Sequence, residues 1–254
     1  MAESERLLAV LVTGSGSGIG AAICRRLARP GVGILVHALS NEAGCRRVAA
    51  EVEEAGGHAL VVLGDLSRPD TGAMLVERAV AAFGGLDQLI ANAGFPDRAP
   101  FGKLARERLD YVFDVVTGGF FEMTTAALPY LRKATCGRVV AISTHNVHVY
   151  RTDYPWYPAS ATAKAGLEAM SKTLAMQLAP SNVTVNVIAP GLIEKEPGTE
   201  QFLSPEEWQG FREKVPLGRI GTPDDIAGVV QFLCSRAADY ITGQVIHVNG
   251  GLFM

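Results

Sequence analysis

A glycine-rich segment near the start of the chain holds the residues best suited to bind a charged ligand. Thr13-Gly14-Ser15-Gly16-Ser17-Gly18-Ile19-Gly20 follows an apolar run and leads into a helical pattern. Glycine permits positive φ angles and lets the backbone approach a bound group closely. The free N–H groups and the positive dipole end of the next helix attract an anion. In this strand–turn–helix context the spacing predicts a turn that binds the pyrophosphate of a dinucleotide; a plain glycine-rich turn is the alternative.

His145 and His148 form a second group that can do chemistry, in a loop after another apolar run. Histidine titrates near neutral pH, so either residue can act as an acid or bind a polar substrate. Ordinary loop histidines are the alternative. Their spacing is compatible with a metal ligand pair, but no third ligand is evident, and we expect no metal site.

Short apolar runs alternate with longer helical patterns and must position these residues. The runs are apolar almost throughout, as strands buried on both faces require. We expect strands at residues 7–12, 33–38, 59–64, 86–91, 138–143, 183–189 and 244–248. Helical patterns between them include residues 41–55 and 68–83. This alternation predicts an α/β fold with a doubly wound, seven-stranded parallel sheet and helices on both faces.

The chain is expected to form a single domain over residues 1–254, with a short polar tail at residues 1–6. Its 254 residues are 48% hydrophobic, which is enough for a large core, and no linker or internal repeat is visible. The least regular stretch begins at Pro190. We expect a flap at residues 190–214, because ligands bind at the carboxyl ends of strands in such folds; an ordinary surface loop is the alternative.

The composition argues against several classes of partner. The net charge is −3 and no long Lys/Arg run occurs, which disfavours nucleic acid. Cys24, Cys45, Cys136 and Cys234 are far apart, as is typical of unpaired thiols in an intracellular protein. No basic segment followed by an apolar one suggests a secretory signal, and no apolar run approaches the roughly 18 residues that span a bilayer. We expect no membrane association and a cytoplasmic location.

Five motifs in order resemble the short-chain dehydrogenase/reductase family. The first is the turn, with its Thr-Gly-x3-Gly-x-Gly pattern. The others are Gly64-Asp65-Leu66, Asn92-Ala93-Gly94, Ala189-Pro190-Gly191-Leu192-Ile193, and a closing stretch from Pro216-Leu217-Gly218-Arg219 through Ile241-Thr242-Gly243-Gln244 to Asn249-Gly250-Gly251. The resemblance covers almost the whole chain. It implies a Rossmann-type fold, NAD(P)(H)-dependent hydride transfer to or from a small carbonyl or enoyl substrate, and a homotetramer.

The resemblance also implies which residues contact the cofactor. These are Gly14, Ser15, Ser17, Gly18, Ile19, Gly20, Ser40, Asn41, Asp65, Leu66, Asn92, Ala93, Gly94, Lys164, Pro190, Gly191 and Ile193. Residues 37–41 lack the carboxylate that NAD-specific members carry, and Ser40 and Asn41 can donate to a 2′-phosphate, so NADP is favoured. NAD is the alternative, since no Arg lies in the turn. We expect His37 to be a strand-end residue.

The family's catalytic Tyr-x3-Lys pair is altered in this sequence. In the family the Tyr hydroxyl exchanges a proton with the substrate oxygen, and the Lys binds the nicotinamide ribose and favours the phenolate. Lys164 matches the Lys, but Ser160 stands four residues before it and Tyr157 seven before it. Tyr157-x6-Lys164 is similar to the enoyl-acyl-carrier-protein reductases of the same superfamily. We expect Tyr157 to exchange the proton; a packing aromatic is the alternative. Pro158 suggests that a helix starts there.

Other family positions also differ. Thr144 stands where the catalytic Ser falls, with Ser143 beside it as a substitute. Val116 replaces the supporting Asn, and Lys195 replaces a nicotinamide-contacting Thr. These departures leave enoyl and carbonyl reduction both open. They also leave a function of another class, a nucleotide-binding homologue that has lost catalysis and acts as a sensor or partner subunit.

Overall fold

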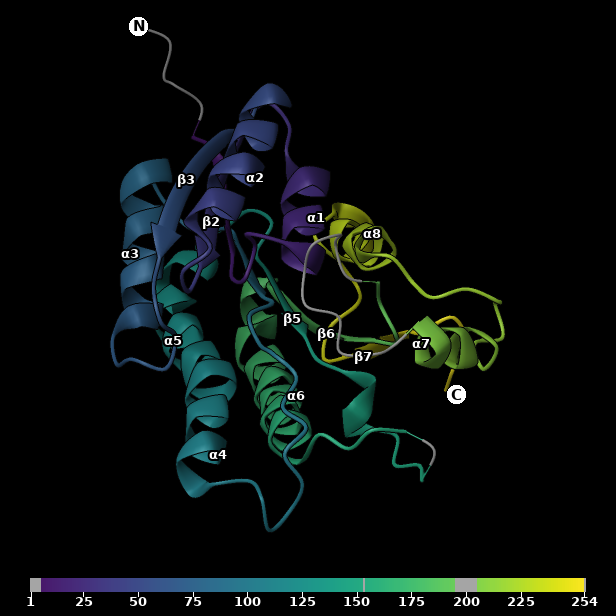
Figure 1. Ribbon diagram of the computed structural model, residues 1–254. Coiled ribbons are helices and arrows are strands. Elements are labelled where there is room, and N and C mark those ends of the chain that lie inside the picture. Colours follow the sequence, from purple (N-terminus) through teal and green to yellow (C-terminus); the bar gives the residue numbers. More distant parts are fainter. Residues whose placement is uncertain (1–5, 153, 195–204, 254) are drawn as a thin grey trace, which may run out of the picture.

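A seven-stranded parallel sheet forms the centre of the described chain (Figure 1). The computed structural model describes residues 6–152, 154–194 and 205–253. In them the strand order is β3-β2-β1-β4-β5-β6-β7. The strands are β1 (Leu8–Val12), β2 (Val32–Ala38), β3 (His58–Leu63), β4 (Gln88–Ala91), β5 (Arg138–Ile142), β6 (Thr184–Pro190) and β7 (Val245–Val248). The reversal of strand order beside β1 makes the fold doubly wound, as the sequence predicted.

Helices cover both faces of this sheet. On one face lie α1 (Gly18–Leu27), α2 (Glu42–Glu54) and α8 (Pro223–Leu233); on the other lie α3 (Thr71–Phe83), α4 (Arg106–Phe113), α5 (Gly119–Leu131) and α6 (Pro158–Leu178). A π-helical turn at Asp114–Gly118 joins α4 to α5, and α7 (Pro205–Arg212) lies apart from both layers, near the C-terminal residues (Figure 1). Short 3-10 helices occur at His145–Val147, Ala179–Ser181 and Arg236–Ala238.

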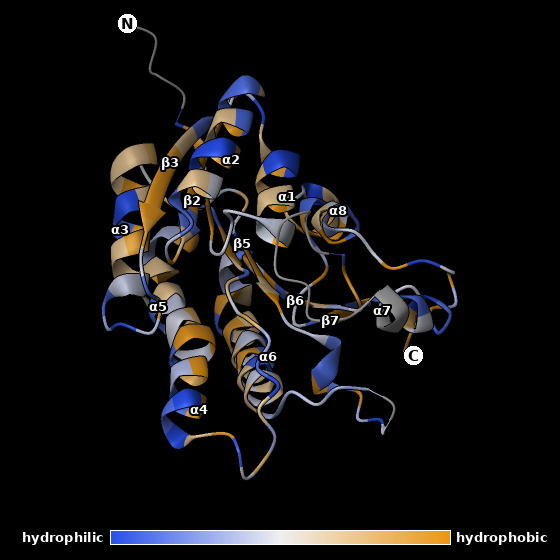
Figure 2. Cartoon of the chain, viewed as in Figure 1, coloured by the Kyte–Doolittle hydropathy of each residue, from blue (hydrophilic) through white to orange (hydrophobic). Residues whose placement is uncertain are grey.

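Two hydrophobic cores, one on each face, hold the sheet between the helices. Along β1, Ala9 and Leu11 join the core beneath α3 to α6, while Val10 and Val12 join the core beneath α1, α2 and α8. All four are fully buried. Figure 2 shows the apolar strands lying between the two helical layers. Burial on both faces explains why the strand sequences are continuously apolar and why their predicted ends agree with the structure to within two residues.

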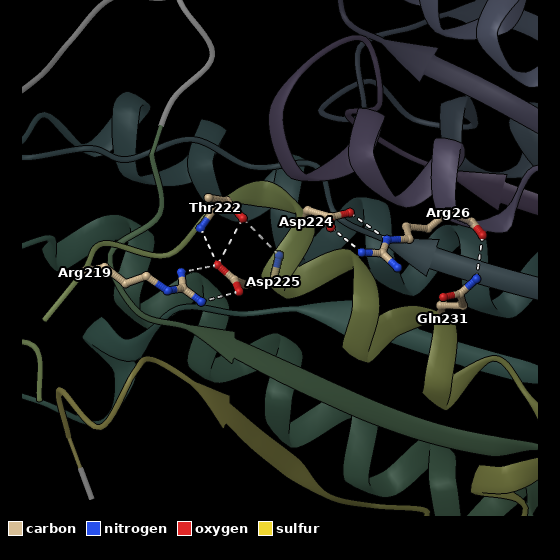
Figure 3. A network of polar contacts seen from close by, with 6 residues as sticks. All are labelled: Arg26, Arg219, Thr222, Asp224, Asp225 and Gln231. Atoms are coloured by element: carbon tan, nitrogen blue, oxygen red, sulfur yellow. Dashed lines mark hydrogen bonds and ion pairs between the residues drawn. The ribbon is translucent and has the colours of Figure 1, made fainter. Parts of the chain in front are cut away.

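The N-terminus of α8 is fixed by a network of charged groups (Figure 3). The Thr222 hydroxyl accepts a hydrogen bond from the Asp225 N–H, and the Asp225 carboxylate accepts one from the Thr222 N–H, which makes a capping box. Arg219 pairs with Asp225 at 2.7 Å, and this guanidinium holds the pKa of the Asp225 carboxyl well below its usual range. Asp224 pairs with Arg26 of α1. The network thus links α8 to α1.

Four free cysteines lie in different parts of the fold. Cys24, Cys45 and Cys234 are buried, and Cys136 is partly exposed. Burial raises the pKa of the Cys24 and Cys234 thiols to about 12 and also raises that of Cys45. The Cys136 thiol lies 3.8 Å from the Cys234 carbonyl oxygen, just before β5.

The predicted flap lies partly outside the described residues, which omit 195–204. Its described start runs beside the segment before α8: Glu194 N–H donates to the Gly221 carbonyl, and Gly221 N–H donates to that of Leu192. Its described end is α7. None of the helices in the described ranges is long and apolar enough to cross a bilayer.

Candidate active site

The glycine-rich turn is held against the end of β4 by backbone and side-chain hydrogen bonds. The Asn92 amide donates to the carbonyl oxygens of Thr13 and Gly14, both at 3.0 Å. The Thr13 hydroxyl accepts from the N–H groups of Asn92 and Ala93, each at 3.1 Å. A Cβ on Gly20 would lie 2.3 Å from the Gly14 carbonyl oxygen, so α1 begins directly against the turn. These contacts hold the glycine-rich turn against the end of β4 and the start of α1.

Beneath the turn, Ser15 and His37 join it to β2. Ser15 is fully buried; its hydroxyl donates to the Val12 carbonyl, and its N–H donates to that of His37. The His37 ring accepts from the Gly14 N–H at 3.3 Å and donates to the Gly64 carbonyl at 3.0 Å, which fixes one neutral tautomer. Burial lowers its pKa. Both side chains thus hold the turn in place from below.

A cavity of about 250 Å³ lies beside the turn, at the carboxyl ends of β2, β3 and β4. Of the predicted cofactor contacts, it is lined by Gly14, Ser17, Asn41, Asp65, Leu66, Ala93 and Gly94. Ser40 is exposed and does not line it. The Asn41 side chain is already engaged: its oxygen accepts from Gly44 N–H at the start of α2, and its amide donates to the Gly16 carbonyl. Asn41 therefore shapes this cavity more than it offers a free donor.

A second cavity, of about 420 Å³, continues from the turn toward β5 and β6. The sequence-predicted residues that line it are Gly14, Ser17, Ile19, Asn92, Gly94, Ser143, Thr144, Tyr157, Lys164, Pro190, Gly191 and Ile193. His145 and Ser160 line it as well. We call it the catalytic cavity. The two cavities share Gly14, Ser17, Gly94 and Phe95, so together they form an elongated site across the turn.

Lys164 lies buried at the inner wall of the catalytic cavity. Its ammonium donates to the Ile142 carbonyl at 2.5 Å and reaches the Ala93 carbonyl at 3.4 Å. Burial lowers the pKa of Lys164 to about 8, against the opposing effect of the Glu168 carboxylate. A Cβ on Gly94 would lie 3.2 Å from Lys164 Nζ, so glycine leaves room for the lysine. Val116, in the π-helical turn, lies behind it.

Ser160 holds the loop that follows β4. Its hydroxyl accepts from the Asp97 N–H at 2.7 Å and donates to the Phe95 carbonyl at 3.1 Å. The Asp97 carboxylate pairs with Arg108 at 2.6 Å, which fixes the loop a second time. The Ser160 hydroxyl proton is therefore already used in a hydrogen bond to a backbone carbonyl.

The same loop carries Arg98 onto Tyr157, the residue just before α6. Arg98 Nε donates to the Tyr157 hydroxyl oxygen at 3.2 Å, and its guanidinium carbon lies 5.6 Å from the ring centroid. The predicted helix start at Pro158 is confirmed. Tyr157 and its hydrogen-bond partner Arg98 thus both line the catalytic cavity.

The hydroxyls of Thr144 and Ser143 have different hydrogen-bond partners. Ser143 donates to the buried Glu168 carboxylate, which also contacts His148 Nε2 at 3.0 Å. The Thr144 oxygen accepts from the Asn146 N–H at 3.3 Å, and this leaves its proton available to a ligand in the cavity. Of the two predicted hydroxyls, Thr144 is the better placed to bind a substrate oxygen.

His145 is buried and paired through both ring nitrogens. Nδ1 donates to the Pro190 carbonyl at 2.9 Å, so Nε2 accepts from the Tyr154 hydroxyl at 2.8 Å. Burial lowers the His145 pKa to about 4, and the ring stacks on Phe253. Across the described ranges, no three His, Cys, Asp or Glu residues come together as a metal site.

Comparison with known proteins shows which family the chain belongs to. Residues 14–253 match the family model described as Enoyl-(Acyl carrier protein) reductase. A 3-oxoacyl-(acyl-carrier-protein) reductase of Aquifex aeolicus is 38% identical over 247 residues, which is 96% of each chain. An uncharacterized oxidoreductase of Methylorubrum extorquens is 38% identical over 99% of this chain and all of its own. The chain belongs to the short-chain dehydrogenase/reductase family.

A solved short-chain dehydrogenase of Burkholderia cenocepacia, in complex with NADP, has the same fold. Its TM-score is 0.88 at 27% identity, over 98% of this chain and 99% of that one. The chain thus belongs to a family of NAD(P)-using oxidoreductases.

Within this short-chain dehydrogenase/reductase, sequence reasoning did not identify Arg98 as part of the site, and it gave Tyr154 no role of its own beyond a place in the loop, residues 145–156, that was expected to shape the substrate pocket. Neither residue lies in a recognised motif. Only their position in the sequence could have indicated them, because loops at the carboxyl ends of parallel strands line the ligand crevice. Arg98 follows β4, and Tyr154 lies between β5 and α6.

Proposed function

We propose that this protein transfers hydride between NADP(H) and a carbonyl or enoyl substrate, with Tyr157 as the proton donor or acceptor. The observation that carries the proposal is the shared catalytic cavity, which brings Tyr157, Lys164 and Thr144 together with the glycine-rich turn. Loss of catalysis is the alternative. Tyr157, paired with Arg98, argues against it, because the cavity still contains a polarised hydroxyl.

The residues present fit a dinucleotide. Gly14 and Gly18 have φ of 62° and 56°, and a side chain at Gly94 would press on Lys164. These glycines leave the backbone open to a phosphate and a ribose. The bound cofactor supplies or accepts the hydride. Lys164, whose ammonium has one proton beyond those directed at the Ile142 and Ala93 carbonyls, is the residue to hold a ribose hydroxyl.

Tyr157 and Arg98 account for the proton. In the reducing direction the Tyr157 hydroxyl gives its proton to the substrate oxygen, and the Arg98 guanidinium stabilises the oxygen left behind. Thr144 donates to the same substrate oxygen and orients it. Ser160 acts indirectly, because it holds the loop that carries Arg98.

NADP is preferred over NAD in this proposal, because the cavity-lining residues at the end of β2 (His37, Ala38, Leu39 and Asn41) include no carboxylate that would repel a 2′-phosphate. The carboxylate that does line this cavity, Asp65, follows β3. The Burkholderia neighbour holds NADP. Carbonyl reduction is the first candidate reaction, because the Aquifex aeolicus relative is a 3-oxoacyl-(acyl-carrier-protein) reductase. Enoyl reduction is the second candidate, because the Tyr157-x6-Lys164 spacing resembles that branch.

Steady-state NADPH oxidation with a panel of ketones and a crotonyl thioester tests the proposal. We expect turnover in wild type and a loss of about 10²-fold or more in kcat/KM for Tyr157→Phe, the range for a general acid. The Arg98→Gln variant should have a lower kcat than wild type, and Arg98→Lys should keep part of the wild-type kcat. Tyr240→Phe, at a fully exposed tyrosine, is the matched control and should behave as wild type.

Binding measurements accompany these assays. Calorimetric Kd values for NADPH should stay near wild type in Tyr157→Phe and should be lower than those for NADH. Tight NADPH binding by wild type without turnover on any substrate of the panel would favour the sensor function instead.

A further inference from the structure

An aromatic cleft of about 500 Å³ opens beside the catalytic cavity. It lies between the loop after β4, the segment before α6 and the first turn of α6. Its walls include Phe101, Tyr150, Trp156 and Pro158. The cleft and the catalytic cavity share Asn146, Tyr154, Pro155 and Tyr157, so they are continuous at the proposed proton donor.

The exposed aromatic side chains of this cleft are unusual for a protein surface. Phe101 is 89% exposed, Tyr150 78% and Trp156 61%. A contiguous exposed apolar patch of this kind marks a binding surface more often than chance exposure does. Arg151 is the one charged residue among the described residues that line the cleft. The surface is thus suited to an apolar group.

Hydrogen bonds hold two of its walls in position. Trp156 Nε1 donates to the Arg151 carbonyl at 3.1 Å, although the indole face is exposed. The Tyr154 hydroxyl is held by His145, and Pro155 and Pro158 restrict the backbone on either side of Trp156. A preformed apolar surface loses little conformational entropy when it binds a ligand.

We propose that the aromatic cleft binds the apolar body of the substrate, whose reacting carbon lies beside Tyr157. The substrate class is then ketones, enones or their alcohols that carry an extended hydrocarbon or aromatic group. The cleft volume lies within the range of about 300–1,000 Å³ typical of small-molecule sites. This inference rests on the proposed function, because it uses Tyr157 as the reacting end.

A series of methyl ketones from butanone to decanone tests the cleft in the full chain with NADPH. Each buried methylene contributes about 0.8 kcal/mol, so kcat/KM should rise by about fourfold per carbon until the cleft is filled. In the double variant Phe101→Ser/Tyr150→Ser, the ratio of kcat/KM for decanone to that for butanone should fall by at least about tenfold. Phe232→Ser, at an exposed aromatic of α8, should leave the ratio unchanged.

Fluorescence supplies a readout that does not depend on turnover. The chain has two tryptophans, so Trp208→Phe leaves Trp156 as the single tryptophan, whose emission is excited selectively on the red side of tyrosine absorption. Decanone should change this emission at saturable concentrations, and butanone should change it much less. A Trp156 response in a protein without turnover would support the cleft and contradict the proposed function.

Two results would overturn the inference. One is turnover that is equal for butanone and decanone, with no Trp156 response. The other is a smaller molar mass by light scattering for the double variant than for wild type, which would make this face an interface between copies of the chain.

Discussion

At the residue scale, burial of the His145 ring makes the folded chain measurably less stable in acid. Its pKa is about 4 in the folded chain and about 6.5 when unfolded, so the unfolded chain binds a proton over a pH range in which the folded chain does not. The stabilisation is complete above pH 6.5 and is lost as pH falls toward 4. Between pH 7 and 4.5 this removes on the order of 2–3 kcal/mol from the free energy of unfolding.

Urea unfolding at the two pH values measures this contribution. His145→Gln keeps a donor for Pro190 and an acceptor for Tyr154 but does not titrate, so its stability should fall less on acidification than that of wild type. His148→Gln, on the partly exposed histidine beside Glu168, is the matched control. If acidification lowers the free energy of unfolding equally in wild type and His145→Gln, another group is responsible for the acid sensitivity.

At the element scale, the capping box of α8 stabilises more than one helix. Thr222→Ala removes the acceptor of the Asp225 N–H and should lower the free energy of unfolding by about 1 kcal/mol. Thr222→Ser keeps the hydroxyl and should lose much less. Thermal or urea unfolding of the three proteins distinguishes them, and a Thr222→Ala protein as stable as wild type would mean that the Arg26 and Arg219 pairs alone fix this terminus.

Sequence patterns predicted the ends of helices well where a particular residue type, such as proline, favours a helix start, and less well elsewhere. Pro158 marked the start of α6 correctly. In contrast, α3 begins at Thr71 and not near residue 68, because Asp65 binds Ser67 in a turn and Asp70 takes a positive φ of 68°. The π-helical turn at Asp114–Gly118 has no mark in the sequence; in the fold this turn and α4 both pack against α6.

At the scale of the whole molecule, the fold follows from sequence, and the glycine-rich turn and Lys164 do line one cavity, while the contacts of several other residues of that cavity do not follow from sequence. The glycine spacing and Lys164 each carry a local signal. The pairing of Arg98 with Tyr157 instead joins two loops 59 residues apart, and the pairing of His145 with Tyr154 depends on a loop conformation. Likewise, the role of Ser160 required the position of the Phe95 carbonyl, which only the folded chain supplies.

The four free thiols give the molecule a natural position for a spectroscopic label. Cys24, Cys45 and Cys234 are protected by burial, so a maleimide dye should react with one thiol per folded chain, at Cys136, and with all four in urea. Mass spectrometry counts the adducts, and Cys136→Ser should abolish the reaction of the folded protein. Because Cys136 precedes β5 and the site lies beyond the carboxyl end of that strand, the dye would lie at the opposite edge of the sheet. Ligand binding would then be followed through the diffusion of the labelled protein or through energy transfer involving the dye. The two cavities and the aromatic cleft would stay unmodified.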